Sequence, residues 1–345
     1  MRRLLMSAVA VAVAAATVAG CGGGSKKDNP LDRSGGGDQA GGTKTVTVYT
    51  SEPDTDINAM IEAFNEKYPD IKVKTFRSGT EQVLSKIEAE KKAGALKADV
   101  VFIADALSME KLKGDDLLQK YTSPNAKGID EQYMDPEGYY EGTKVIATGL
   151  AINTDDVKKA PDSWDVLTKP VTKGKAVMPS PLYSGAAAYN VALFAGKSDF
   201  GWQYWKGVAD NGTRVVQGNG SVLEAVSKGQ QDYGMVVGFI VARAAEQGSP
   251  VKFIYPREGV PVITEPIALM KKAPHAKASK KFIDFVFSPA GQQVESGLGY
   301  VPLDPDAKVP NGLTGVDDIN VMSGDTQKLI TKVEGAKSKF KNTFN

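Results

Sequence analysis

Hydrophobic and polar positions switch between strand-like and helix-like periods from Thr45 onward. Residues 45–49 (TVTVY) are rich in β-branched side chains and predict a strand. Apolar residues then recur every three or four positions between Ile57 and Tyr68, which predicts an amphipathic helix. Further strands are predicted at residues 71–76, 98–103, 176–178, 214–217 and 233–237, and further helices at 80–92, 187–195, 202–209 and 221–228.

This order of elements predicts the fold class. Strands that alternate with helices form parallel βαβ units in an open α/β sheet. Residues 98–103 (ADVVFI) have no polar alternation after Asp99, as expected of a strand covered on both faces. A chain of 345 residues favours two domains over one. We therefore expect two α/β lobes that bind a ligand at the carboxyl ends of the strands, in the crevice between the lobes.

The N-terminal segment predicts export. Arg2 and Arg3 precede the apolar stretch 4–18, which is shorter than the roughly 20 residues that a membrane-spanning helix needs. Residues 1–20 are therefore predicted to be a signal peptide. They end in Val18-Ala19-Gly20-Cys21, which resembles the bacterial lipobox, where the cysteine is acylated. The alternative is a plain secreted protein in which Cys21 is incidental.

Acylation of Cys21 predicts an extracytoplasmic protein anchored to the cell membrane. Two or more acyl chains at one site hold a protein stably at a lipid surface, as a single chain does not. The segment 21–43 that follows is dominated by Gly, Ser, Asp and Lys. It has hardly an apolar side chain to bury, so it is predicted to be a flexible linker.

Composition removes several classes of chemistry. Lys and Arg number 42 against 41 Asp and Glu, so no overall charge indicates a nucleic-acid partner. One Cys and one His exclude a Cys/His zinc cluster and a disulfide within the chain. A Ser-His-Asp triad would require His275, which lies in a polar segment and is expected to be exposed. We expect neither a cofactor nor a resident metal.

Three predicted helix starts have the composition of an anion site. They are Arg77-Ser78-Gly79-Thr80, Tyr183-Ser184-Gly185-Ala186 and Gly218-Asn219-Gly220-Ser221. Each offers free backbone N–H groups and the positive end of a helix dipole, and glycine lets a ligand approach closely. The alternative is ordinary helix capping. The candidate ligand-binding residues at these starts are Arg77, Ser78, Gly79, Thr80, Ser184, Gly185, Ala186 and Asn219.

Three acids are candidates for a second part of the same site. The same loops also carry the carboxylates of Glu52, Asp105 and Glu265. Their carboxylates can receive an ammonium group or a metal. The alternative is that they are solvated loop acids that cap helices.

Four segments carry a resemblance to a known family: TVYTSEPD, FNEKYPDIKV, ADVVFIAD and KKFIDFVFSPAGQQ. With the lipobox and linker, they resemble the solute-binding lipoproteins of ABC importers, and within these the ferric-ion-binding-protein-like group. The resemblance covers nearly all of residues 44–303. It implies a hinged, two-lobed fold, the type 2 periplasmic-binding-protein fold. It also implies an ABC permease with its ATPase as partners, and a monomer.

The resemblance also implies the lobe boundaries. The chain would cross between lobes near Val145–Leu150 and return near Pro261–Pro266. The first lobe would then comprise residues 44–147 and 262–315, the second lobe 148–261, and residues 316–345 would form a C-terminal extension.

The residues that hold iron in ferric members are altered here. The segment GQQDYGMVVGFIVARAAEQG shows Gly238-Phe239 where the resemblance implies a tyrosine pair, and Ala104 stands at the acidic ligand, with Asp105 following. A ferric ion needs anionic oxygen ligands, and Phe supplies none. By contrast, Ser184-Gly185-Ala186 resembles the group's anion-binding helix start. The resemblance therefore implies an oxyanion such as aminoethylphosphonate or a sugar phosphate, with Gly238 and Phe239 also at the site.

Three functions stay open on the sequence. The favoured one is a non-enzymatic binding protein that closes on a small anionic solute and delivers it to a permease. A ferric-ion-binding lipoprotein is the second. The third, from another class, is an exported enzyme that hydrolyses phosphate esters in the same cleft.

Overall fold

The computed structural model describes residues 44–303 and 309–344. The predicted signal peptide, the predicted lipidation site at Cys21 and the predicted linker lie outside the described residues and stay predictions. Within the described ranges, no helix combines the length and the apolar character that crossing a membrane requires.

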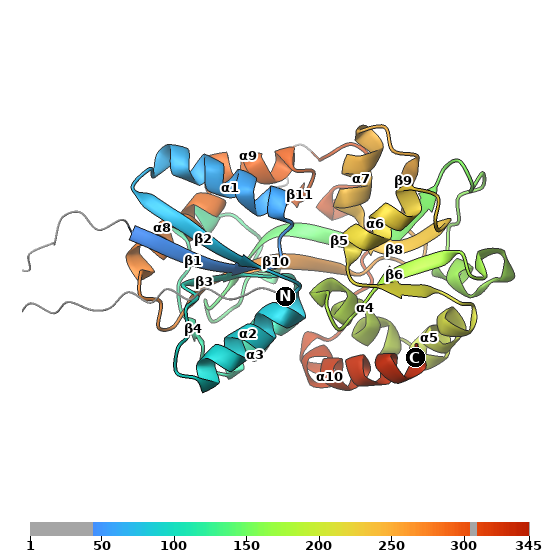
Figure 1. Ribbon diagram of the computed structural model, residues 1–345, viewed down its shortest axis with the longest axis horizontal. Helices are drawn as coiled ribbons and strands as arrows, with labels where there is room; N and C mark the ends of the chain where they lie inside the picture. The colour runs from blue at the N-terminus through green and yellow to red at the C-terminus, as the bar shows by residue number, and fades with distance from the viewer. Residues whose placement is uncertain (1–43, 304–308, 345) are drawn as a thin grey trace, which may run out of the picture. The chain divides into compact units, whose positions relative to one another are not determined.

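One mixed sheet runs through the described chain (Figure 1). Its strands follow the order β2–β1–β3–β10–β5–β8–β6–β7, with β4, β9 and β11 paired beside this path. The six strands predicted from the sequence are all present. The bounds are β1 Lys44–Thr50, β2 Ile71–Arg77, β3 Val100–Phe102, β4 Leu118–Gln119, β5 Glu141–Asn153, β6 Ala176–Pro179, β7 Arg214–Val216, β8 Tyr233–Val237, β9 Val251–Ile254, β10 Val262–Met270 and β11 Val301–Pro302.

The long strand β5 belongs to both halves of the sheet. Its residues up to Ala147 pair with β10, and from Thr148 onward it pairs with β8. We call the half built on β1, β2 and β3 the first lobe, and the half built on β6, β7 and β8 the second lobe. The change of partner between Ala147 and Thr148 supports the predicted crossover, while the exact lobe boundaries stay predictions.

The predicted parallel βαβ units are present in each lobe, and the strands between them are antiparallel. β1 is parallel to β2 and β3, and β6 is parallel to β7 and β8, as βαβ units require. The central strand β5, however, is antiparallel to both β10 and β8, and β10 is antiparallel to β3. These two strands connect the lobes instead of closing βαβ units, so the helix–strand alternation did not reveal their direction.

Helices cover both faces of the sheet in each lobe (Figure 1). In the first lobe, α1 and α9 lie on one face and α2 and α3 on the other. In the second lobe, α6 and α7 lie on one face and α4, α5 and α10 on the other. The bounds are α1 Asp54–Lys67, α2 Thr80–Lys92, α3 Ala106–Gly114, α4 Gly185–Ala195, α5 Gly201–Asp210, α6 Asn219–Ser227, α7 Gly238–Glu246, α8 Ala276–Val286, α9 Pro289–Gly297 and α10 Thr326–Thr343, with short 3₁₀ turns at Pro124–Ala126, Glu131–Tyr133, Trp164–Thr168, Pro170–Thr172 and Val316–Asp318.

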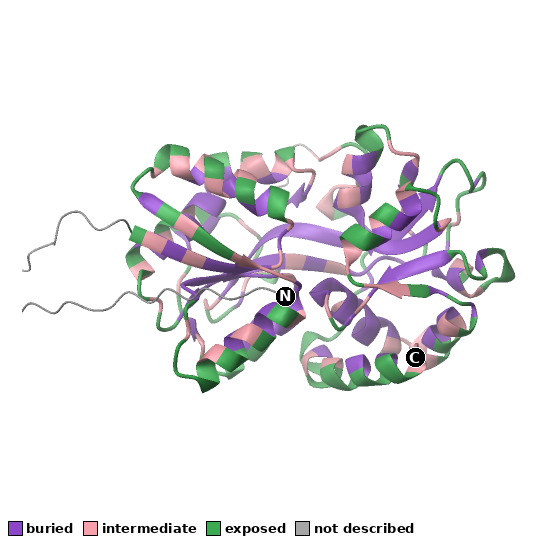
Figure 2. Cartoon of the chain, viewed as in Figure 1, coloured by how far each residue is buried: buried purple, intermediate pink, exposed green. Residues whose placement is uncertain are grey.

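Each lobe buries its own aromatic core between the sheet and its helices (Figure 2). In the first lobe, Phe64 of α1 packs edge-on against Phe282 of α8, with ring centroids 5.2 Å apart. In the second lobe, Trp164 and Phe194 meet edge-on at 5.2 Å, and both are fully buried. Aromatic pairs in this geometry stabilise a core beyond the area that they bury.

The C-terminal helix α10 completes the second lobe. It packs along α4, and its Phe340 lies 6.1 Å from the ring of Trp205 on α5. Its Lys337 is nearly buried and pairs at 2.7 Å with Glu81 of α2 in the first lobe. The segment predicted as an extension thus contacts both lobes and supports α4 from behind.

Candidate functional site

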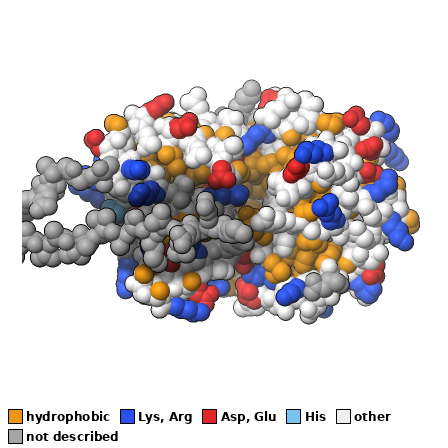
Figure 3. Space-filling model, in the orientation of Figure 1, with side chains coloured by type: hydrophobic (Ala, Val, Ile, Leu, Met, Phe, Trp, Pro, Cys, Tyr) orange, Lys and Arg blue, Asp and Glu red, His pale blue; other side chains and the backbone are white. Residues whose placement is uncertain are grey.

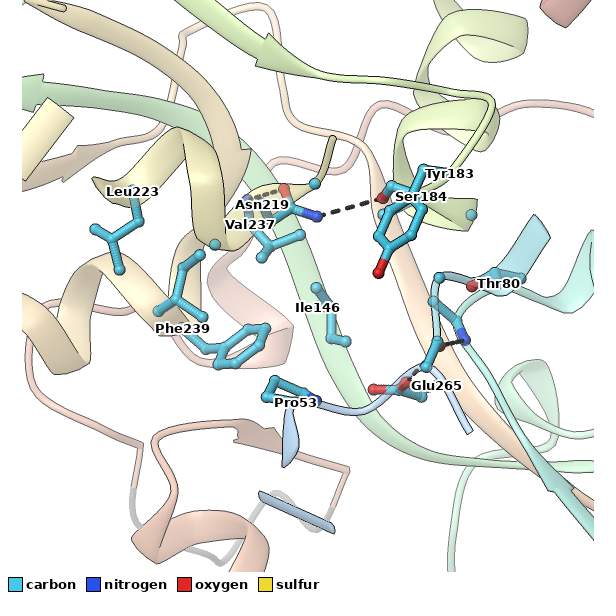
Figure 4. A pocket seen from close by; sticks show the side chains of 18 of the residues that line it. Pro53, Thr80, Ile146, Tyr183, Ser184, Asn219, Leu223, Val237, Phe239 and Glu265 are labelled. Carbon is cyan, nitrogen blue, oxygen red and sulfur yellow. Dashed lines mark hydrogen bonds between the residues drawn. The ribbon is translucent and has the colours of Figure 1, made fainter. Parts of the chain in front are cut away.

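A cavity of about 320 Å³ lies between the two lobes, where strands of both end (Figure 4). The sequence-predicted residues that line it are Arg77, Gly79, Thr80, Ser184, Gly185, Ala186, Asn219, Phe239 and Glu265. The predicted residues that do not line it are Glu52, Ser78, Asp105 and Gly238. The remaining lining residues are Ser51, Pro53, Ala104, Ile146, Tyr183, Gln217, Gly218, Gly220, Ser221, Leu223, Val237, Ile240, Arg243 and Ile263.

The start of α2 faces the second lobe across this cavity. Gly79 precedes the helix, and a Cβ atom there would lie 2.4 Å from the carbonyl oxygen of Tyr183. No side chain fits in that space, so glycine is required for the two segments to approach. The amide of Glu81 donates to the same oxygen at 3.4 Å. Because Gly79 has no side chain, no side chain caps α2, and the amide of Gln82 donates instead to the Gly79 carbonyl oxygen at 2.9 Å.

The start of α4 closes the cavity from the second lobe. Ser184 caps the helix by accepting a hydrogen bond from the amide of Ala187 at 3.3 Å. A Cβ atom on Gly185 would lie 2.3 Å from Oδ2 of Asp105 and 2.9 Å from Oγ1 of Thr80. The N-terminus of α4 therefore packs directly against the first lobe, which again requires glycine.

Asn219 connects the start of α6 by hydrogen bonds to the starts of α4 and α7. Its Nδ2 donates to Oγ of Ser184 at 3.3 Å, and its Oδ1 accepts from the amide of Val237 at 3.3 Å (Figure 4). The start of α6, which follows Gly218, is thereby fixed beside the starts of α4 and α7. Gly218 leaves the first amides of α6 without a side-chain cap. All three predicted anion-binding helix starts thus meet at one cavity.

Thr80 brings an unused hydrogen-bond donor to this meeting point. Its side chain is 1% exposed, and Oγ1 has no hydrogen-bond partner. Buried hydroxyl groups are normally hydrogen-bonded, because an unpaired one retains its full desolvation penalty. Six buried side-chain atoms of the described residues lack a partner, and Oγ1 of Thr80 is the one whose residue lines the cavity, which makes it a candidate donor to a ligand.

Two arginines line the cavity, and both make fixed contacts. Arg77 donates through Nε to the carbonyl oxygen of Glu52 at 2.8 Å. Arg243, which sequence reasoning missed, donates through both terminal nitrogens to the carboxylate of Asp56 at 2.9 and 3.0 Å. Burial opposes ionisation of Asp56, but hydrogen bonds from Arg243 and Tyr300 outweigh it and lower the pKa of Asp56. Because α1 carries Asp56 and α7 carries Arg243, this ion pair links the lobes.

A buried charge cluster lies directly behind the cavity in the first lobe. Lys144 is fully buried and contacts Glu52, Glu295 at 2.9 Å and Glu265 at 3.7 Å. Burial raises the pKa of Glu265 well above its ordinary value, the charge of Glu52 raises it further, and Lys144 opposes both. Glu265 is the member that lines the cavity, where Ser51 donates to it at 3.2 Å. The raised pKa favours a neutral carboxyl, which weakens its repulsion of an anion.

Asp105 caps a helix, as the alternative for these acids held, but it is buried instead of solvated. Its Oδ1 accepts from the amide of Ser108 at 2.8 Å and caps α3, and its Oδ2 accepts from the Ser108 hydroxyl at 3.0 Å. Burial raises the pKa of Asp105 to about 7, against the lowering effect of the Ser108 hydrogen bonds. Asp105 thus lies behind Gly185, packed against the start of α4, and off the cavity lining.

The lining offers few ligands for a metal ion. Phe239, where the resemblance implied a tyrosine, stacks on Tyr300 with ring centroids 4.1 Å apart. Among the lining residues, Tyr183 supplies the one phenol and Glu265 the one carboxyl group. Within the described residues, no three His, Cys, Asp or Glu side chains are grouped so that they could hold a metal. This donor set fits a ferric ion poorly.

The net charge of the molecule does not explain a preference for anions. On the face shown in Figure 3, acidic and basic side chains are interspersed, as expected from 42 basic and 41 acidic residues. Any preference for an anion therefore arises locally, from backbone amides, the helix dipoles of α2, α4 and α6, and the lining side chains Arg77 and Arg243.

Comparisons with known proteins agree with this architecture. The profile of the bacterial extracellular solute-binding protein family matches residues 96–317. A probable ABC transporter periplasmic-binding protein (y4fP) of Sinorhizobium fredii is 28% identical over 274 residues, which are 76% of this chain and 75% of the relative.

Solved structures are similar in fold at low sequence identity. The periplasmic binding protein AfuA from Actinobacillus pleuropneumoniae, with fructose-6-phosphate bound, superposes with a TM-score of 0.80 at 23% identity, covering 88% of this chain and 99% of AfuA. Iron-bound HitA from Pseudomonas aeruginosa gives 0.75 at 20% identity, covering 86% and 99%. The chain has the two-lobed α/β fold of type 2 periplasmic binding proteins, and it belongs to the bacterial extracellular solute-binding protein family.

Proposed function

We propose that this protein is the substrate-binding lipoprotein of an ABC importer, and that it captures a small oxyanionic solute. The solute is an organophosphonate, such as aminoethylphosphonate, or a sugar phosphate. The protein is held outside the cytoplasmic membrane by acylated Cys21, acts as a monomer, and delivers its solute to a membrane permease driven by an ATPase.

One observation carries this proposal: three helix starts from two lobes converge on one cavity that contains an orphaned, buried hydroxyl. Each helix start contributes first-turn backbone amides and a partial positive charge. Hydrogen bonds to a charged oxygen stabilise by roughly 1.5–3 kcal/mol each. A few of them suffice for micromolar affinity, which corresponds to about 8 kcal/mol. The fructose-6-phosphate complex of AfuA supports a phosphate-bearing solute for this fold.

The arrangement of ionisable groups argues against the two alternatives. A ferric ion would have a single phenol and one carboxyl group of raised pKa among the lining side chains. An enzyme that hydrolyses phosphate esters would need a base beside a nucleophile, and His275 instead lies immediately before α8, off the cavity lining, and contacts Asp99 at 3.3 Å. Binding without turnover is therefore the function that the site supports best.

Titration calorimetry on the purified protein tests the proposal. We expect inorganic phosphate or methylphosphonate to bind with release of heat, and glucose and ferric citrate to give no signal. Released phosphate is assayed in the same samples after incubation with a phosphate ester. Failure of every phosphate and phosphonate to bind would refute the proposal, and so would multiple-turnover release of phosphate.

Gly220 offers a matched pair of variants for the backbone contribution. Gly220 lines the cavity in the first turn of α6, and a Cβ atom there would have open space around it. Gly220→Pro removes the amide donor at a position where proline is tolerated, whereas Gly220→Ala keeps the donor. We expect roughly tenfold or greater loss of anion affinity for the proline variant, from the loss of one such hydrogen bond. The alanine variant should bind like the wild type.

A further inference from the structure

The cavity has two unlike sides (Figure 4). Thr80, Tyr183 and Ser184 lie on one side, where the helix starts meet. Phe239 and Leu223 lie on the opposite side. The apolar lining residues are Pro53, Ile146, Leu223, Val237, Phe239, Ile240 and Ile263. Anion binding by backbone amides does not require an apolar side.

Contacts within the protein already fix the side chains on the apolar side of the cavity. Phe239 is 7% exposed and stacks on the buried ring of Tyr300. The guanidinium of Arg243 lies over the ring of Phe239, with its central carbon 5.5 Å from the ring centroid. Val237 is also nearly buried, and its amide is held by Asn219. These side chains therefore form a fixed wall that a ligand can pack against without reordering them.

The charged group on this side is already engaged within the protein. Arg243 donates through Nε to the carbonyl oxygen of Leu298 at 2.9 Å and through its terminal nitrogens to Asp56. Little donor capacity is left there for the hydroxyl groups of a sugar. A polyol placed against this wall would lose its hydrogen bonds to water without replacing them.

We propose that the solute carries a hydrocarbon substituent beside its oxyanion group, and that this substituent packs against Phe239, Ile240 and Leu223. The solute class is then an alkyl- or arylphosphonate or the corresponding phosphate monoester, in preference to a sugar phosphate. This inference rests on the proposed function, because the oxyanion must occupy the helix starts for the substituent to reach the wall.

The size of the cavity limits the length of the substituent, and the hydrophobic effect sets the gain in affinity for each added carbon. About 320 Å³ is at the lower end of the range for small-molecule sites, so it accepts an anion with a short chain or one ring. Burial of one methylene group contributes about 0.8 kcal/mol, equivalent to about a fourfold tightening of affinity. The dissociation constant should therefore fall about fourfold with each added carbon until the wall is covered.

Calorimetric titration with a homologous series tests this inference. The probes are methyl-, ethyl-, propyl- and phenylphosphonate, with glycerol 3-phosphate and fructose 6-phosphate as polar comparisons. We expect affinity to rise from methyl- to propylphosphonate and both polar phosphates to bind more weakly than propylphosphonate. Equal affinity along the series, or tighter binding of a sugar phosphate, would overturn the inference while leaving the oxyanion site intact. Failure of every probe, inorganic phosphate included, would overturn both.

A pair of variants separates the wall from general destabilisation. Leu223→Ser removes hydrocarbon from the wall but leaves the helix starts unchanged, so affinity for methylphosphonate should persist while the gain with chain length shrinks. Leu96 is likewise partly buried but lies off the cavity lining, so Leu96→Ser is the control and should keep the full gradient. An unchanged gradient in Leu223→Ser would contradict the assignment of the wall.

Discussion

The unpaired hydroxyl of Thr80 allows one side chain to be tested for a role in binding without a role in folding. Thr80→Val replaces the hydroxyl with a methyl group of nearly the same shape. Oγ1 is buried without a partner in the free protein, so its removal breaks no internal hydrogen bond. Removal of an unsatisfied buried polar group is neutral or stabilising, by up to about 1–3 kcal/mol.

The effect on binding should have the opposite sign. If Oγ1 donates to a charged ligand oxygen, its loss costs roughly 1.5–3 kcal/mol of binding free energy. Because about 1.4 kcal/mol corresponds to a factor of ten, the dissociation constant should rise roughly 10- to 150-fold. Thr80→Ser keeps the hydroxyl and should retain most of the affinity.

The assay combines calorimetric titration of the tightest-binding phosphonate with denaturant unfolding of the free protein. Thr213→Val is the control, because Thr213 is also buried with an unpartnered Oγ1 but does not line the cavity. It should match Thr80→Val in stability and the wild type in affinity. A Thr80→Val variant that loses stability, or that binds as tightly as the wild type, would contradict a ligand-binding role for the Thr80 hydroxyl.

Three further predictions concern the buried charges. Asp105→Asn removes a carboxyl group whose pKa is raised from 3.8 to about 7, so ionisation of this group lowers the stability of the folded wild type as pH rises from 4 to 7. In denaturant unfolding, the free energy of unfolding of the variant should rise by about 2–3 kcal/mol relative to the wild type between pH 5 and pH 8, and parallel pH curves would contradict this. Lys144→Met leaves the buried carboxylates around it unpaired and should lower the free energy of unfolding by about 3–5 kcal/mol in the same assay, whereas a loss below about 1 kcal/mol would show that the cluster is dispensable. Asp56→Asn weakens the ion pair with Arg243 between the lobes, so solution scattering should show a larger radius of gyration for the free protein while its circular dichroism is unchanged. An unaltered radius would mean that other contacts hold the lobes together.

Local sequence patterns predicted the helix starts, because their causes lie within a few residues. Ser184-Gly185-Ala186 predicted a capped helix at the cleft, and the structure places the cap there. The predicted helices at 187–195, 202–209 and 221–228 begin one or two residues earlier in the structure, where the first turns contain glycine.

Contacts between distant parts of the chain were not predictable in the same way. Arg243 and Asp56 are 187 positions apart, and only the folded chain brings them together. Glu52 and Asp105 follow strands, as site residues do, yet their side chains turn inward to Lys144 and Ser108. Apart from Phe239, the apolar side of the cavity was not predicted, because Ile146, Ile263 and Leu223 have the pattern of ordinary core residues and nothing local distinguishes a cavity wall from a core.

A crystal structure of the protein with its tightest-binding phosphonate tests directly whether the helix starts hold the oxyanion. We expect phosphonate oxygens within hydrogen-bond distance of backbone amides at the starts of α2, α4 and α6, with the Thr80 hydroxyl among the donors. A phosphonate bound elsewhere, or one held by side-chain charges with those amides turned away, would contradict it.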